Sequence, residues 1–318
     1  MNAQLEIPKR PVRKFLAEDF KVASWDALKP FFDDLLNRKL DSVSDLKKWF
    51  HDRSELESVI GEDLAWRYIN MTCYTENEEY RNRYQDFVEN IQPQIAPVSD
   101  KLNKKAAASP FLNELASVTG YDLMIRNLKK DIEIFREENV PLYTQISTEA
   151  QKYQQLSGAM TVDVNGKELT LQQASVYLMS TDRKLREEVY HKVTTRRLQD
   201  KEALDNLFTG LVDLRHRVSV NAGFKTFRDY MYKSLGRFDY TPQDCFDYHN
   251  AIEHEVVPIL DEFSKERKAA LQVTELRPWD KAVDPEGREA LKPFSNGKEL
   301  TEKTIEVFRR LDPFLGQC

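Results

Sequence analysis

Long amphipathic stretches decide the fold, and the clearest is residues 203–220, ALDNLFTGLVDLRHRVSV. Leucines recur in it at steps of three and four residues, at positions 204, 207, 211 and 214. This spacing places them on one face of a helix, because an α-helix turns once in about 3.6 residues. The same periodicity begins at Trp25, and another long helix is expected from residue 110 or 111 to 135. We therefore expect an all-α fold of long, antiparallel helices.

One segment, residues 159–171, breaks the helical pattern. Its sequence AMTVDVNGKELTL alternates apolar and polar residues on either side of Asn165-Gly166. That dipeptide readily adopts the positive φ angles of a two-residue type I′ turn. We expect one small β-hairpin here, packed on the helices, because a lone hairpin is not stable in water. We also place a domain boundary at this point, between an N-terminal helical region at 1–157 and a second region at 158–318.

Prolines and glycines mark further boundaries. Pro93 and Pro97 are expected to bend or end the helix in which they fall, because proline lacks the N–H that an inner helix turn needs. Thr241 is expected to cap a helix that begins at Pro242. Residues 277–297 contain three prolines and two glycines. They are expected to form an ordered loop wrapped on the surface.

Composition excludes several classes of protein. The 318 residues are 41% apolar and 31% charged, with only ten glycines and 13 prolines, so disorder and collagen-like repeats are excluded. No run of 18 apolar residues occurs, and residues 1–15 lack the apolar core of a signal peptide. The 47 basic and 53 acidic residues give a thinly spread net charge of -6. We expect neither a nucleic-acid nor a membrane partner.

The cysteines point to a reducing compartment. Cys73, Cys245 and Cys318 are odd in number, far apart, and lack a C-x-x-C spacing. We interpret them as reduced thiols. The sequence therefore predicts a cytoplasmic protein.

A search for chemistry finds one candidate metal cluster, residues 249–255, HNAIEHE. His249 and His254 are five residues apart, so they lie roughly 140° apart around a helix, whereas a zinc-binding His-Glu-x-x-His pair lies about 40° apart. His254 opens such a motif, but its second ligand position is Pro258, which cannot bind a metal. A polar helix face explains these residues better, and we assign no metal ligand and no cofactor to this chain.

Nucleophile and phosphate motifs are also missing. No G-x-S-x-G occurs, and the glycines never form G-x-G-x-x-G or G-x-x-x-x-G-K. We assign no catalytic residue to the chain.

Aromatic residues are dense in residues 224–242, FKTFRDYMYKSLGRFDYTP. Rings with polar tips interleaved with charges can line a peptide-binding cleft, and they can equally form an ordinary core edge. Arg237 and Tyr240 are the candidate substrate contacts in this segment.

Three long segments are distinctive: SGAMTVDVNGKELTLQQA (157–174), NAGFKTFRDYMYKSLGRFDYTPQDCFDYHNAI (221–252) and LRPWDKAVDPEGREALKPF (276–294). They resemble one known family, the oligoendopeptidase F branch of the thimet-oligopeptidase-like zinc metallopeptidases. The resemblance implies a helical fold in which two halves enclose a deep channel that admits short unfolded peptides. It also implies a His-Glu-x-x-His helix with a downstream glutamate, which together bind zinc that polarises the scissile carbonyl.

The chain departs from that family in one respect, because residues 1–318 contain no His-Glu-x-x-His. We therefore expect an N-terminal, truncated part of a peptidase that supplies scaffold and one channel wall and is inactive alone, with zinc belonging to the full-length enzyme. The alternative is a stand-alone helical module that binds peptides or proteins without the chemistry. An apolar stripe near the end can pack backward on the same domain or against a partner, and the second case predicts self-association of the fragment; its members are Leu300, Ile305, Phe308, Leu311, Phe314 and Leu315.

Overall fold

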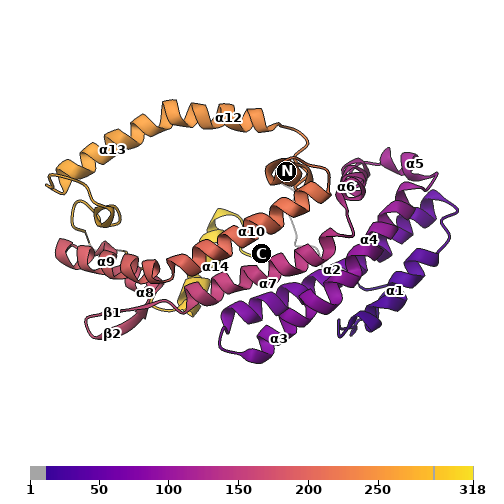
Figure 1. Cartoon of the computed structure of the whole chain (residues 1–318), viewed down its shortest axis with the longest axis horizontal. Coiled ribbons are helices and arrows are strands. Elements are labelled where there is room, and N and C mark those ends of the chain that lie inside the picture. Colours follow the sequence, from indigo (N-terminus) through magenta and orange to yellow (C-terminus); the bar gives the residue numbers. More distant parts are fainter. Residues whose placement is uncertain (1–11, 289–290, 318) are drawn as a thin grey trace.

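Helices form most of the structure, a computed structural model that describes residues 12–288 and 291–317. Cys318, one of the three predicted thiols, lies outside the described residues. The N-terminal part is a helical bundle in which α1 (Trp25–Asn37), α2 (Val43–Cys73), α3 (Glu78–Asp86) and α4 (Gln92–Ala107) lie side by side in Figure 1. The short α5 (Leu112–Ala116) and α6 (Tyr121–Ile134) complete it. The predicted mainly α-helical fold is thus confirmed.

The bundle has a well-packed core. Trp49 on α2 is fully buried, and its indole Nε1 donates to the carbonyl oxygen of Leu35 at 2.9 Å. Leu28, Phe32 and Leu35 of α1 are also buried, as the i, i+4, i+7 spacing of their helix requires. Burial of these side chains supplies the main driving force for folding of the bundle.

Proline shapes two of the helices through π-helical turns. A π-helical segment, η1 (Phe87–Ile91), joins α3 to α4 immediately before Pro93. A proline ring clashes with the carbonyl four residues earlier, and a wider turn at that point relieves the clash. Of the two expected outcomes, bending or ending, the helix does not end at Pro93 or Pro97, because the chain stays helical to Ala107.

The helix expected from residue 110 or 111 to 135 is two helices. It breaks between Ala116 and Tyr121, where Gly120 takes a φ of +92°. A left-handed residue cannot continue an α-helix, and glycine adopts it at little cost. Because of this break, α5 buries Leu115 and α6 buries Leu128 in the core of the bundle.

The hairpin is present as predicted. Strand β1 (Thr161–Val164) pairs with β2 (Lys167–Thr170), with Val162 opposite Leu169. Asn165 and Gly166 have φ angles of 56° and 76°, as a type I′ turn needs. The buried face of β1 packs on α8 (Leu171–Ser175) and α9 (Arg183–Gln199), which are joined by the 3₁₀ turn η2 (Val176–Met179).

Two long helices connect the regions before and after the hairpin. Helix α7 (Asn139–Gly158) lies along α10 (Lys201–Asn221), and the two share a small core with α11 (Phe227–Ser234). The side-chain amide of buried Asn139 donates to the carbonyl oxygen of Val218 at 3.0 Å, across the α7–α10 contact. The domain boundary at 157/158 stays a prediction.

The last elements stand apart from the packed helices. Helix α12 (Pro242–Ala251), the π-helical η3 (Ile252–Val256) and α13 (Val257–Ala270) form one long curved rod, here called the arch, which is orange in Figure 1. Its π turn again precedes a proline, Pro258. The chain returns to α9 through the 3₁₀ turn η4 (Pro278–Asp280) and then forms α14 (Gly297–Leu311). None of the residues in the arch or in α14 is buried.

Candidate functional site

The aromatic segment 224–242 divides into a buried part and an exposed part. Tyr230 on α11 is buried, and it packs with Phe224 and Phe227 in the core shared with α7 and α10. Its hydroxyl is hydrogen-bonded to that of Tyr143 on α7, and burial together with this bond raises the pKa of Tyr143. This half of the segment is therefore core, the second of the two interpretations that the sequence allowed.

The exposed part, the α11–α12 corner, carries both candidate substrate contacts. The guanidinium of Arg237 lies 5.0 Å from the ring centroid of Tyr232 and 6.0 Å from that of Tyr240, and Tyr240 is 44% exposed. Thr241 caps α12 in a capping box with Asp244, and Pro242 is the first helical residue, both as predicted. The structure thus brings Arg237 and Tyr240 together on the surface; their contact with a substrate stays a prediction.

A thiol also lies at this corner. The Sγ atom of Cys245 is 2.7 Å from the hydroxyl oxygen of Tyr232. The pKa of Tyr232 is raised, mainly by this contact, although the nearby Arg237 opposes the shift. The corner therefore combines aromatic faces, a fixed cation and polar tips, which together can hold an extended peptide by stacking and by hydrogen bonds.

The histidine-rich segment 249–255 lies on the arch. His249 is in the last turn of α12, while His254 and Glu255 lie in the π turn, and all three are exposed. In the part of the chain that the structure describes, no three His, Cys, Asp or Glu side chains converge as metal ligands. The exposed side chains of segment 249–255 therefore do not fit a zinc ion.

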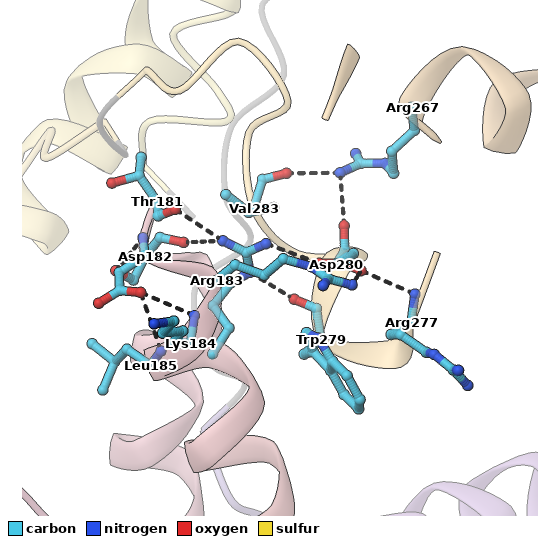
Figure 2. A network of polar contacts seen from close by, with 12 residues as sticks. Thr181, Asp182, Arg183, Lys184, Leu185, Arg267, Arg277, Trp279, Asp280 and Val283 are labelled. Carbon is cyan, nitrogen blue, oxygen red and sulfur yellow. Dashed lines mark hydrogen bonds and ion pairs between the residues drawn. The ribbon is translucent and has the colours of Figure 1, made fainter. Parts of the chain in front are cut away.

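A buried ionic cluster anchors the far end of the arch, and sequence reasoning missed it. Asp280 is completely buried and accepts hydrogen bonds from Arg183 Nη2 at 2.8 Å, from Arg186 Nη2 at 2.9 Å and from the Arg277 backbone N–H at 3.0 Å (Figure 2). Arg183 and these further donors hold the pKa of Asp280 well below its usual range, although burial opposes them.

The same cluster joins the arch and η4 to the side chains of α9. Arg267, near the end of α13, donates to the carbonyl oxygen of Val283 at 2.7 Å, and Figure 2 shows it beside Asp280. Arg186 is itself buried and donates from Nε to the carbonyl oxygen of Trp279 at 2.8 Å. The loop that was expected to be ordered is therefore fixed to α9 at its first residues.

The chain can now be compared with known proteins. Residues 15–135 match the model of the peptidase M3 N-terminal domain, and residues 176–311 match the model of peptidase family M3. The chain belongs to peptidase family M3. No curated protein sequence matches it. Within the part of the chain that the structure describes, none of the helices is long and apolar enough to cross a membrane.

Solved structures of oligoendopeptidase F and of PZ peptidase A share the fold of this chain. A protein assigned to oligoendopeptidase F is 21% identical with a TM-score of 0.87, and PZ peptidase A with a bound inhibitor gives the same identity and TM-score. Both alignments cover 96% of this chain and 54% of the other. A protein from Bacillus anthracis str. Ames, also assigned to oligoendopeptidase F, is 22% identical with a TM-score of 0.85, over 95% of this chain and 56% of the other. The chain thus spans about half the length of these structures.

Proposed function

We propose that this chain forms the N-terminal part of an oligoendopeptidase F-like zinc metallopeptidase that hydrolyses short peptides. In this proposal residues 1–318 supply scaffold and one wall of the substrate channel. The observation that carries it is the fold: almost the whole chain superposes on about half of an oligoendopeptidase F, with a TM-score of 0.87. Matches to both M3 domain models support it.

Uncovered apolar surface also supports the proposal. Along the arch, Val256, Leu260 and Phe263 recur at helical spacing and are 42%, 54% and 59% exposed. On α14, Phe308 and Leu311 are 42% and 71% exposed. Contiguous exposed apolar faces mark surfaces that another part of an assembly covers. We propose that the remaining half of the peptidase covers them.

Zinc is proposed for the full-length enzyme and is assigned no ligand in this chain. Neither the sequence, which lacks His-Glu-x-x-His, nor the exposed His254 supports a site here. We therefore expect the zinc motif to lie outside residues 1–318. The free thiols of Cys73 and Cys245 support a reducing, cytoplasmic setting for the enzyme.

The first test uses the purified 318-residue chain. We expect no stoichiometric zinc by elemental analysis and no chelator-sensitive cleavage of a fluorogenic oligopeptide. Stoichiometric zinc together with chelator-sensitive cleavage would overturn the proposal.

The second test is reading the gene beyond codon 318. An open frame that contains His-Glu-x-x-His is expected, and the extended protein should cleave the same oligopeptide. A stop codon at that point would favour the stand-alone interaction module instead.

A further inference from the structure

Contacts with the rest of the protein hold the arch at its two ends. At the first end, the guanidinium of Arg228 on α11 lies 5.7 Å from the ring centroid of Phe246. At the second end, Arg267 donates to the carbonyl oxygen of Val283. Between them, over residues 249–264, the hydrogen bonds, ion pairs and ring contacts of the described residues all stay within the arch. The middle of the arch is therefore open to a partner.

One side of the second half of the arch is an apolar stripe. It consists of five side chains that are between 42% and 59% exposed: Val256, Val257, Ile259, Leu260 and Phe263. At about 100° per residue these positions fall within roughly 160° of the helix circumference. A stripe with this spacing is the face by which an amphipathic helix packs on another helix. The arch stripe therefore fits a partner that is itself a helix with an apolar face.

The same stretch of chain is strongly acidic. Residues 238–264 carry seven aspartates and glutamates and no lysine or arginine. The whole chain has 53 acidic and 47 basic residues, so removing these seven leaves 46 acidic residues against 47 basic ones. The net charge of -6 is thus concentrated on the arch and on the corner that leads into it, rather than spread along the chain.

Carboxylates border the apolar stripe on both sides. Four acidic side chains of the arch are exposed and have no ion pair in the described part of the chain; they are Glu253, Glu255, Asp261 and Glu262. At about 100° per residue, Asp261 falls just beyond Val257 on one border of the stripe. Glu262 falls just beyond Ile259 on the other border. A helix that packs on the stripe therefore meets negative charge on either side of it.

Helix α14 shows the opposite arrangement of charge beside an exposed apolar face. Its glutamates pair with basic residues one turn further on, Glu299 with Lys303 at 2.7 Å and Glu306 with Arg310 at 3.0 Å. The carboxylates beside the arch stripe form no such pair among the described residues. Positive charge for them has to come from the partner, because like charges across an interface repel and opposite charges fix the choice of partner.

We propose that a basic amphipathic helix covers the arch, with its apolar residues on the stripe and its lysines or arginines facing Asp261 and Glu262. The source of this helix rests on the proposed function: it is the remaining half of the peptidase, since the chain spans only about half the length of the solved structures. The arch of a second copy is a poorer partner, because it carries the same excess of carboxylates.

Titration of the purified chain with synthetic peptides tests the proposal. The probe is an amphipathic helical peptide of leucine and lysine, about 15 residues long. One control replaces every lysine by glutamate, and a second keeps the composition but scatters the leucines, so that no apolar face forms. We expect single-site binding of the probe, at least about tenfold tighter than binding of either control and weakened by added salt.

Three results of this titration would overturn the proposal. Absence of probe binding at millimolar concentrations would mean that the stripe accepts no such helix. Equal affinity for the glutamate peptide would mean that the carboxylates do not select the partner. Equal affinity for the scattered peptide would mean that charge alone attracts it, as for an extended cationic peptide.

Variants locate the binding surface. Asp261→Asn/Glu262→Gln should weaken probe binding by about fivefold or more, since it removes the charge on both borders of the stripe. Glu302→Gln/Glu306→Gln on α14 removes the same charge elsewhere and should leave the affinity within about twofold. Circular dichroism confirms that each variant folds. Wild-type affinity in the folded arch variant, or an equal loss in the α14 variant, contradicts the proposal.

Failure of this inference can be told apart from failure of the proposed function. If the gene continues into a His-Glu-x-x-His peptidase but the probe binds no better than its glutamate control, the basic helix is excluded and the proposed function stands. If the probe binds as expected and the gene ends at codon 318, the acidic docking surface stands and the proposed function fails.

Discussion

The N-terminal bundle and the arch have the same kind of sequence but opposite burial. Both repeat apolar residues at helical spacing; yet Leu28 and Trp49 in the bundle are fully buried, whereas Leu260 and Phe263 on the arch are more than half exposed. Periodicity therefore specifies that a helix has an apolar face, and it does not specify whether the partner of that face lies in the same stretch of chain. In this protein the apolar faces of the bundle helices pack on one another, whereas the apolar face of the arch packs on no other helix in the described residues.

The largest effect expected from this difference is on stability. Trp49→Ala should lower the free energy of unfolding by about 3–5 kcal/mol, because it leaves a cavity and removes the bond to Leu35. Phe263→Ala on the arch is the matched control and should change it by no more than about 0.5 kcal/mol. Urea denaturation followed by circular dichroism measures both. A similar loss for the two variants would mean that the arch is packed in solution.

The next effect concerns the anchor between the arch and α9. Asp280→Asn should destabilise the chain by about 3 kcal/mol at pH 7, because it leaves buried Arg186 without its carboxylate partner. The folded-state pKa of Asp280 is lowered from its ordinary value of 3.8, so its stabilisation is complete above that value and is lost as the pH falls below it.

The stability difference between wild type and Asp280→Asn should therefore shrink between pH 4 and pH 2. Urea midpoints across this range measure it. Asp239→Asn, whose carboxylate is 81% exposed, is the control and should change stability by no more than about 0.5 kcal/mol. A constant difference at all pH values would show that the Asp280 carboxylate is not what anchors the arch.

A smaller effect is expected on the exposed face of the arch. The purified chain should bind a hydrophobic dye and self-associate, and the double variant Leu260→Glu/Phe263→Glu should lower the dye signal by roughly half without changing stability. Lys265→Glu on the same helix is the charge-matched control and should leave the signal unchanged. Dye fluorescence and size-exclusion chromatography give the measurements. A monodisperse monomer that binds no dye would mean that the apolar face of the arch is covered in solution, as that of the bundle is.

Local signals in the sequence were sufficient for much of this fold. The spacing of leucines in residues 203–220 predicted α10, Asn165-Gly166 predicted the hairpin turn, and Thr241 with Pro242 predicted the start of α12. Each depends on neighbours within one turn of the chain. The expected helix to residue 135 failed because a single left-handed glycine, Gly120, outweighs the periodicity around it.

The sites were harder to predict, because their partners lie far apart in the chain. Asp280 binds arginines that are 94 and 97 residues away. A spacing rule within one helix cannot find such a pair. The available signal was weak: two arginines one turn apart at 183 and 186, and a Trp-Asp pair within a proline-rich loop. By contrast, Arg237 and Tyr240 are close in sequence, and the structure places them together.

The smallest effect is expected at the α11–α12 corner, where the packed region changes into the arch. Arg237→Met should cost about 0.5–1 kcal/mol of stability, because it removes the cation from the faces of Tyr232 and Tyr240. Arg217→Met, an exposed arginine without a ring contact in the described residues, should cost less. If the corner is also a channel contact, Arg237→Met in the extended, active protein should raise KM for the oligopeptide more than it lowers kcat. An unchanged KM alongside the expected stability loss would show that this corner only supports the arch. The substrate contacts of the channel wall would then lie on the arch itself.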